Sequence, residues 1–319
     1  MTEEELKRAQ PALYSLLKRG FERDSMPQAL LLYSSPRCAF RTLVRYIAQS
    51  LSCSSGGFAD NSCTECRRFL SGTHPDYIEI DGADANIKKD QIAQLRDFFS
   101  MSSVENRTRR RAYAIVDCQS MTEEAANALL KFLEEPAPGI TALLTAPSVE
   151  VVLPTIVSRC QLVRIDPVSR EDIFRSMSDS VGPEVAYFLS DISGDKDRLD
   201  AVGQDEDFKL AAELAADFIS SLLEGRAQAS YSLLSAATKG AGRPRCYNFF
   251  YGDVSRFISD ALAQDGLFGP FASAIERFGQ TEPDLASRME LSLRESMSMA
   301  RANLSFTGVL AQLAELLIG

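Results

Sequence analysis

The stretch QALLLYSSPRCAFRTL, residues 28–43, sets the architecture of the first half of the chain. Its apolar run predicts a buried strand near Ala29–Tyr33, and after a short loop an amphipathic pattern predicts a helix over Thr42–Leu51. Nucleotide-binding proteins carry the phosphate loop G-x-x-x-x-G-K-[ST] in this setting, between a strand and a helix. The stretch therefore predicts a nucleotide-binding scaffold.

The loop itself lacks the residues that phosphate binding requires. Glycines let backbone N–H groups approach the phosphates, and a slim lysine ammonium reaches the β- and γ-phosphates. Phe40 stands where a glycine belongs, and Arg41 stands at the lysine position, so we expect no productive ATP binding. The eight loop positions hold Ser35, Pro36, Arg37, Cys38, Ala39, Phe40, Arg41 and Thr42.

Short β-rich runs alternate with helical patterns in the first half, which predicts an α/β domain with a mostly parallel sheet. The predicted strands are Ala29–Tyr33, Tyr77–Ile80, Tyr113–Asp117, Thr141–Thr145 and Leu162–Ile165. The predicted helices are Thr42–Leu51, Lys89–Met101 and Glu123–Glu135. Ser120 and Glu123 form a capping-box pattern for the last helix, and Pro136 ends it.

The strand signals end after Asp166-Pro167, and the rest of the chain is helical in pattern. Short segments broken by Gly182-Pro183 and Gly194 extend to about Asp205, and longer amphipathic segments follow to Leu317. These boundaries predict an α/β domain over 1–166, a small helical domain over 167–205 and a larger helical domain over 206–319.

Composition and charge limit the possible functions. A net charge of −10 argues against nonspecific nucleic-acid binding by bulk charge. No apolar run approaches the ~20 residues of a membrane helix, and the acidic N-terminus MTEEELKRAQ lacks a signal-peptide layout. We therefore expect a cytoplasmic protein with no membrane contact.

A cluster of cysteines predicts a metal site. Cys53, Cys63 and Cys66 follow the pattern C-x9-C-x2-C, and Asp60 lies three residues before Cys63. Clustered cysteines in a cytoplasmic chain favour metal binding over disulfides, and tetrahedral zinc accepts four ligands, a carboxylate oxygen among them. We predict a structural zinc module at about residues 53–66, and the alternative is three reduced cysteines without a metal.

Two further polar positions lie beside predicted strands. His74, the only histidine, precedes the second strand in GTHPDY and is more typical of a hydrogen-bonding turn than of a ligand. The third strand ends in Asp117-Cys118, where phosphate-loop ATPases carry two acids that hold magnesium and position the attacking water. A thiol cannot replace the second acid, so this pair is degenerate as well.

Two runs of sequence place the chain near a known family. MTEEAANALLKFLEEP, residues 121–136, and LPTIVSRC, residues 153–160, resemble the AAA+ clamp-loader family of bacterial DNA replication. The resemblance covers roughly residues 26–166, with the cysteine cluster, GTHPDY and the run IKKDQIAQL at 87–95, and it returns weakly at 300–304.

The resemblance implies a non-catalytic subunit of the DNA polymerase III clamp loader. Motor subunits of this family keep an intact phosphate loop and an Asp-Glu pair, whereas one subunit typically lacks both and keeps the Ser-Arg-Cys motif. This chain has the second profile. Arg159, between Ser158 and Cys160, is thereby implied to be an arginine finger for the ATP site of a neighbouring motor subunit.

The same resemblance implies partners and domain roles. The partners would be the motor subunits and the delta subunit, with the sliding clamp and primed DNA reached through the assembly. Residues 167–205 would form a helical lid and 206–319 a collar for oligomerisation. Asp60 stands where the family carries its second zinc cysteine, and Thr145 falls where the family senses phosphate.

Two alternatives come from other classes of function. The first is a divergent motor subunit that hydrolyses ATP, against which Phe40, Arg41 and Cys118 argue. The second is a zinc-dependent DNA-binding module that works alone, against which the net charge of −10 argues. An arginine group before the third strand is more typical of a solvated face than of a DNA contact: Arg107, Arg109, Arg110 and Arg111.

Overall fold

The computed structural model describes residues 1–34, 37–83, 85–100, 110–135, 139–240, 242–300 and 306–318. The chain divides into two compact units, Met1–Pro167 and Val168–Gly319. Several positions singled out in the sequence lie outside the described residues: Ser35, Pro36, Met101, Arg107, Arg109, Pro136 and residues 301–304.

The first unit is built on a five-stranded sheet with strand order β2-β3-β4-β1-β5, in which all neighbouring strands are parallel. Its central strands are apolar and buried over nearly their whole length because helices cover both faces. This confirms the predicted α/β class. The strands are β1 (Ala29–Tyr33), β2 (Tyr77–Asp81), β3 (Arg111–Val116), β4 (Ile140–Ala146) and β5 (Gln161–Arg164).

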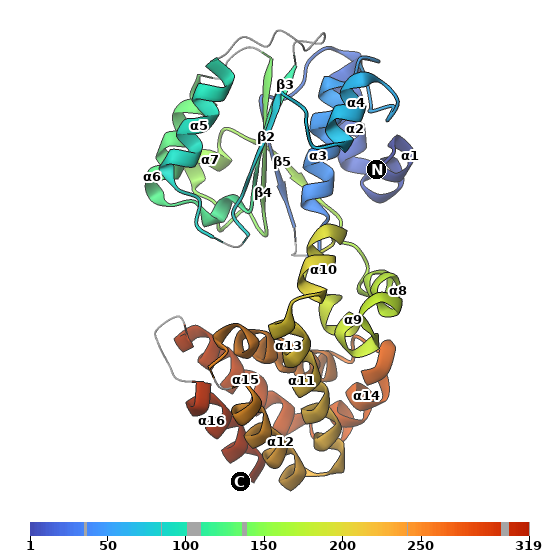
Figure 1. Ribbon diagram of the computed structural model, residues 1–319, viewed down its shortest axis with the longest axis vertical. Coiled ribbons are helices and arrows are strands. Elements are labelled where there is room, and N and C mark those ends of the chain that lie inside the picture. The colour runs from blue at the N-terminus through green and yellow to red at the C-terminus, as the bar shows by residue number, and fades with distance from the viewer. Residues whose placement is uncertain are drawn as a thin grey trace. The chain divides into compact units, whose positions relative to one another are not determined.

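Two helix layers flank this sheet (Figure 1). Because side chains alternate along a strand, Leu30 and Leu32 of β1 enter the core under one layer and Leu31 enters the core under the other. The first layer holds α1 (Glu3–Ala9), α2 (Pro11–Glu22), α3 (Phe40–Ser52) and α4 (Thr64–Leu70). The second holds α5 (Lys89–Ser100), α6 (Glu123–Glu134) and the short α7 (Pro154–Val157).

The helix α6 begins at Glu123, as predicted, but its N-terminal cap differs from the prediction. Thr122 is its N-cap, and the Thr122 hydroxyl accepts a hydrogen bond from the Ala125 N–H at 3.3 Å. Ser120 instead belongs to the short 3-10 helix η1 (Cys118–Ser120). The predicted capping box of Ser120 and Glu123 is therefore wrong, because Ser120 belongs to this 3-10 helix and the cap lies two residues further along the chain.

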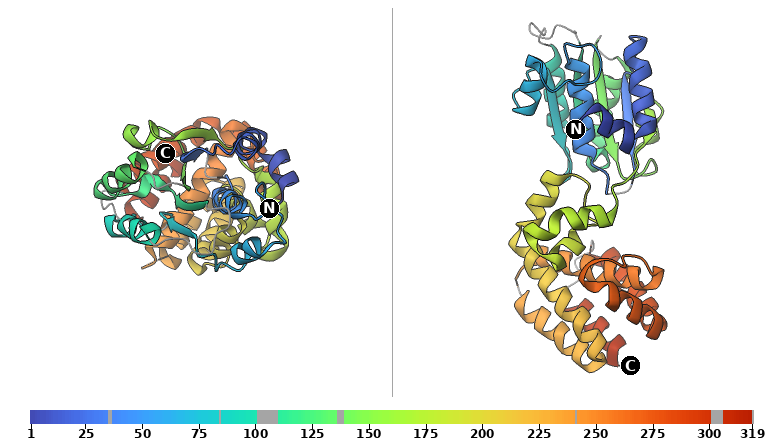
Figure 2. Two further views of the ribbon diagram at one scale, coloured as in Figure 1. Left: turned by 90° about the horizontal axis from the view of Figure 1, so that it is seen from above. Right: turned by 90° about the vertical axis from the view of Figure 1, so that its right-hand side faces the viewer.

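The second unit is helical in its described residues, as the sequence predicts, and the right-hand view of Figure 2 separates its helices. One continuous core joins side chains from all parts of the unit, from Ile173 to Leu317. No helix in the described part of the chain is long and apolar enough to span a membrane. The elements are α8 (Arg170–Val181), α9 (Pro183–Leu189), α10 (Lys196–Gly203), α11 (Glu206–Glu224), α12 (Arg226–Lys239), α13 (Pro244–Ala263), η2 (Gly269–Phe271), α14 (Ala272–Thr281), α15 (Pro283–Ala300) and α16 (Phe306–Ile318).

Candidate functional site

The degenerate loop, residues 35–42, includes the start of α3, and two of its side chains, Cys38 and Phe40, are buried in the core. Phe40 is the first residue of α3 and is only 6% exposed in the core beneath α1–α4. Cys38 is buried, and its Sγ contacts the Ile165 carbonyl oxygen at 3.7 Å. A core-packed benzyl group at a glycine position fixes the backbone for packing and hinders its close approach to phosphate.

Arg41, at the lysine position, pairs with acids of β2. Its Nε lies 2.8 Å from Glu79 Oε1, and its guanidinium forms a second ion pair with Asp81. Arg45, four residues later, donates to the Glu79 carboxylate at 2.9 and 3.1 Å. The charge of Arg41 is therefore balanced within the first unit.

Glu79 and Asp81 were not predicted as partners of the loop. Residues two apart on a strand share one face, so Glu79 and Asp81 in YIEID present both carboxylates to the same side of the sheet. This spacing was the signal in the sequence. That the face meets α3 depends on the fold.

Asp117 and Cys118 stand at the carboxyl end of β3 without the chemistry of an acidic pair. Asp117 has left-handed backbone angles, φ 55° and ψ 53°, and its N–H donates to Thr145 Oγ1 at 2.9 Å. The Thr145 hydroxyl, at the position that the resemblance predicts to sense phosphate, thus accepts a hydrogen bond from the backbone of this chain. Burial raises the pKa of Cys118 to about 12, so the thiol is neutral and cannot serve as a base near pH 7.

Arg159 lies on an exposed turn between α7 and β5. Its Nη1 donates to the Thr155 carbonyl oxygen at 2.8 Å and contacts Ser158 Oγ at 3.3 Å, and its Nη2 lies 2.5 Å from Glu134 Oε1. The side chain is 34% exposed. Cys160 is half-buried, and burial raises its pKa to about 12, which makes it a packing residue in the free chain.

The four predicted zinc ligands converge. The ligand atoms of Cys53, Asp60, Cys63 and Cys66 all lie within 4.8 Å of one another. Sγ of Cys53 and Sγ of Cys63 are 3.9 Å apart. Two thiolates on one tetrahedral zinc, each about 2.3 Å from the metal, would be separated by about 3.8 Å. The side chains therefore fit a closed tetrahedral site.

Two of the four ligands ionise readily, as a metal site requires, whereas burial raises the pKa of the Cys66 thiol well above its ordinary value. Backbone hydrogen bonds from Cys63 and Ser62 lower the pKa of Asp60 to about 2, so it is a carboxylate at neutral pH. Burial opposes ionisation of Cys63, but hydrogen bonds from Ser54 and from the Cys66 backbone lower its pKa to about 7. Zinc requires such deprotonated ligands, and a site with four protein ligands keeps no open position for catalysis.

His74 is a turn residue, as predicted. Its Nδ1 accepts a hydrogen bond from the Asp76 N–H at 3.2 Å, which leaves the proton on Nε2, 3.3 Å from Glu65 Oε2. The ring also stacks against Phe69. In the described part of the arginine group, Arg110 pairs with Asp24 and Arg111 donates to the Phe99 carbonyl oxygen at 3.2 Å.

Several known proteins similar to this chain are subunits of DNA polymerase III. Residues 9–169 match the family described as DNA polymerase III, delta subunit. DNA polymerase III subunit delta′ of Bacillus subtilis is 33% identical over 191 residues, which cover 59% of this chain and 57% of that protein. Subunit gamma of Buchnera aphidicola from Schizaphis graminum is 32% identical over 167 residues, covering 52% of this chain and 45% of that protein.

The chain spans about half the length of these curated relatives. Among solved structures, a DNA polymerase III gamma subunit-related protein of Thermotoga maritima has 18% identity and a TM-score of 0.44, with 95% of this chain and 97% of that chain covered.

Proposed function

Because the chain belongs to the family described as DNA polymerase III, delta subunit, we propose that it is a non-catalytic subunit of the bacterial replicative clamp loader. In this role it binds no ATP productively and presents Arg159 to the ATP site of a neighbouring motor subunit. The assembly, with its motor and delta subunits, would then use ATP to load the sliding clamp onto primed DNA.

The contrast between two arginines carries the proposal. Arg41, at the position of the phosphate-loop lysine, is paired with two carboxylates, Glu79 and Asp81. Arg159 lies on a short exposed turn and has a single, half-exposed carboxylate, Glu134, beside it. A planar guanidinium can contact two phosphate oxygens at once, which suits it to charge that develops on a γ-phosphate. The arrangement therefore favours a chain that lacks its own ATP chemistry and supplies a cation in trans.

The helical unit and the cysteine cluster have structural roles in this proposal. Residues 167–205 would act as a lid domain and residues 206–319 as the collar that joins the neighbouring subunits. Zinc held by Cys53, Asp60, Cys63 and Cys66 would organise the Ser- and Gly-rich segment that contains them. The metal would supply folding energy, since a structural site contributes stability outright.

The test is the DNA- and clamp-stimulated ATPase rate of the reconstituted loader with Arg159→Ala. We expect the rate to collapse while the complex stays assembled, because an arginine supplied in trans contributes about 10³–10⁵ in rate at its site. Arg159→Lys should recover only part of the lost rate, since lysine keeps the positive charge but lacks the planar guanidinium that contacts two oxygens at once.

Arg164→Ala is a matched control, because Arg164 is an exposed arginine on the adjacent strand β5. It should leave the rate unchanged. An unchanged rate with Arg159→Ala would instead make the chain a scaffold without a finger.

The similarity to subunit gamma motivates one other candidate, a divergent motor subunit that hydrolyses ATP. Direct binding of labelled ATP to the purified chain separates the two. Binding at micromolar ATP that is lost in an Arg41→Ala variant would favour the motor subunit, whereas no binding fits the non-catalytic role.

A further inference from the structure

Glu134 forms an ion pair with the guanidinium of Arg159. Glu134 is the last residue of α6, and its Oε1 lies 2.5 Å from Arg159 Nη2. On its other branch the same guanidinium donates to the Thr155 carbonyl oxygen at 2.8 Å. Both branches are therefore occupied within the first unit.

Glu134 lies at the C-terminal end of α6, and this position makes a nearby positive charge more favourable. The C-terminal end of a helix carries partial negative charge, so a carboxylate there is unfavourable without a nearby positive group. Lys131 is the only basic residue in the last turn of α6, and Glu135 follows Glu134 directly. If Arg159 left, Glu134 would remain beside the helix end and a second exposed carboxylate.

We propose that Glu134 is a positioning residue that restrains Arg159 until a neighbouring subunit offers a competing anion, the γ-phosphate of bound ATP. This inference rests on the proposed function of Arg159. When Arg159 binds the γ-phosphate, its guanidinium exchanges the contact with the Glu134 carboxylate for a contact with a more highly charged phosphate. Glu134 therefore sets how much ATP on the neighbour is needed to extract the guanidinium.

The solvent exposure of the pair fixes the size of the effect. The side chains of Arg159 and Glu134 are 34% and 49% exposed, so water and salt weaken their attraction. Exposed pairs of this kind shift an equilibrium by about two- to fivefold. The restraint is thus weak enough for a phosphate to overcome.

The experiment measures ATPase activity of the reconstituted loader against ATP concentration, with Glu134→Gln in this chain. We expect the ATP concentration for half-maximal rate to fall by about two- to fivefold, while the rate at saturating ATP stays unchanged. Glu134→Asp, which keeps the charge, should restore much of the parent value. The difference between Glu134→Gln and parent should shrink at high salt, which a merely structural role would not produce.

Glu135→Gln is the matched control, because it removes the same charge from the adjacent exposed position. It should leave the half-maximal concentration close to that of the parent. If Glu134→Gln behaves like Glu135→Gln while Arg159→Ala still abolishes the rate, the restraint is disproved and the proposed function stands.

A Glu134→Gln variant that needs more ATP than the parent would also overturn the restraint, since Glu134 would then support the engaged arginine. If Arg159→Ala leaves the rate unchanged, the finger itself is disproved, and the inference fails with it. In an Arg159→Ala background, Glu134→Gln should have no further effect, because the residue it acts through is gone.

Discussion

Arg41 and Arg159 carry the same guanidinium in opposite surroundings. Arg41 lies between two carboxylates of β2, and Arg45 adds a second cation to the same cluster. A phosphate that approached Arg41 would have to displace Glu79 and Asp81, and it would meet their negative charge. Arg159 has one exposed carboxylate beside it, and breaking an exposed pair costs little. The same side chain is thus structural at one position and free to change partners at the other.

Cys118 makes the free energy of unfolding of the first unit depend on pH in the alkaline range. Burial raises its pKa from the ordinary 9.0 to about 12, so the folded chain keeps the proton where the unfolded chain loses it. This stabilisation is complete below pH 9 and is lost as pH rises toward 12, by at most about 1.4 kcal/mol per pH unit. Between pH 8 and pH 10.5 we expect Cys118 to lower the free energy of unfolding by at most about 2 kcal/mol, measured by urea denaturation.

Cys118→Ala supplies the comparison for this pH dependence. The variant lacks the titrating thiol, so its free energy of unfolding should fall less steeply above pH 9, whatever its stability at pH 8. Parallel pH profiles for the two proteins would contradict a protonated thiol in the folded chain.

At the scale of elements, the segment between α3 and α4 has little regular structure and depends on its polar side chains. Asp60 accepts hydrogen bonds from two backbone N–H groups, and Cys63 caps the N-terminus of α4. We expect purified chain to carry one zinc ion, measured by elemental analysis under reducing conditions. Cys63→Ser should abolish binding, and Asp60→Ala should weaken it by at least about tenfold, because even outer contacts of a zinc site contribute that much.

The control for the zinc site is Asn61→Ala, which alters the same segment without removing a candidate ligand. It should keep its zinc in a competition with a chelating dye. Metal-free protein with unchanged stability, or equal zinc content in Asp60→Ala and parent, would favour three reduced cysteines or a site without Asp60.

Elements with a clear local pattern could be predicted, whereas their long-range contacts could not. β1 begins and ends at the predicted residues because a run of only five apolar or aromatic side chains, followed by loop residues, is typical of a buried strand. The N-cap of α6 was missed because a 3-10 helix, which the hydrophobic period does not report, precedes it. The partners of Arg41 lie about forty residues away, and only the packing of α3 on the sheet brings them together.

In the candidate sites too, local spacing could be predicted from the sequence, whereas long-range contacts could not. The spacing of Cys53, Cys63 and Cys66 with Asp60 predicted a ligand set, and the structure brings those four side chains together. The motif around Arg159 predicted its role by resemblance, and that role stays a prediction. Its contact with Glu134 crosses 25 residues of sequence and had no local signal.

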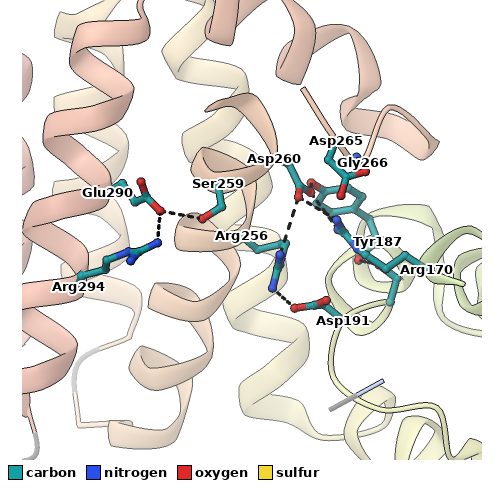
Figure 3. A network of polar contacts seen from close by, with 11 residues as sticks. Arg170, Tyr187, Asp191, Arg256, Ser259, Asp260, Asp265, Gly266, Glu290 and Arg294 are labelled. Atoms are coloured by element: carbon teal, nitrogen blue, oxygen red, sulfur yellow. Dashed lines mark hydrogen bonds and ion pairs between the residues drawn. The ribbon is translucent and has the colours of Figure 1, made fainter. Parts of the chain in front are cut away.

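At the scale of the whole molecule, each unit has its own core, and the second unit adds a buried ionic network (Figure 3). Arg170 of α8 binds both oxygens of Asp260 of α13 at 2.8 and 2.9 Å, and Tyr187 of α9 donates to Asp260 at 2.5 Å. Gly266 adopts φ +67°, and a Cβ at that position would collide with the Asp260 carboxylate. The network therefore ties α8 and α9, of the predicted lid, to α13 of the predicted collar.

Removing one partner of this buried pair should destabilise the second unit strongly. Asp260→Asn leaves the Arg170 charge buried without a counter-ion, and we expect the free energy of unfolding to fall by about 3–5 kcal/mol. The triple variant Arg170→Met, Tyr187→Phe and Asp260→Leu should recover most of this loss, because it leaves neither an unpaired buried charge nor the Tyr187 hydroxyl without an acceptor. Glu171→Gln breaks the exposed pair with Arg175 on the same helix and should cost less than about 1 kcal/mol. Hydrogen exchange should report faster opening of α13 in Asp260→Asn. Protection in the sheet of the first unit should stay unchanged, since the core of the second unit is separate from the cores on the two sides of that sheet. A loss no larger than that of Glu171→Gln would mean that the network adds no stability to the fold.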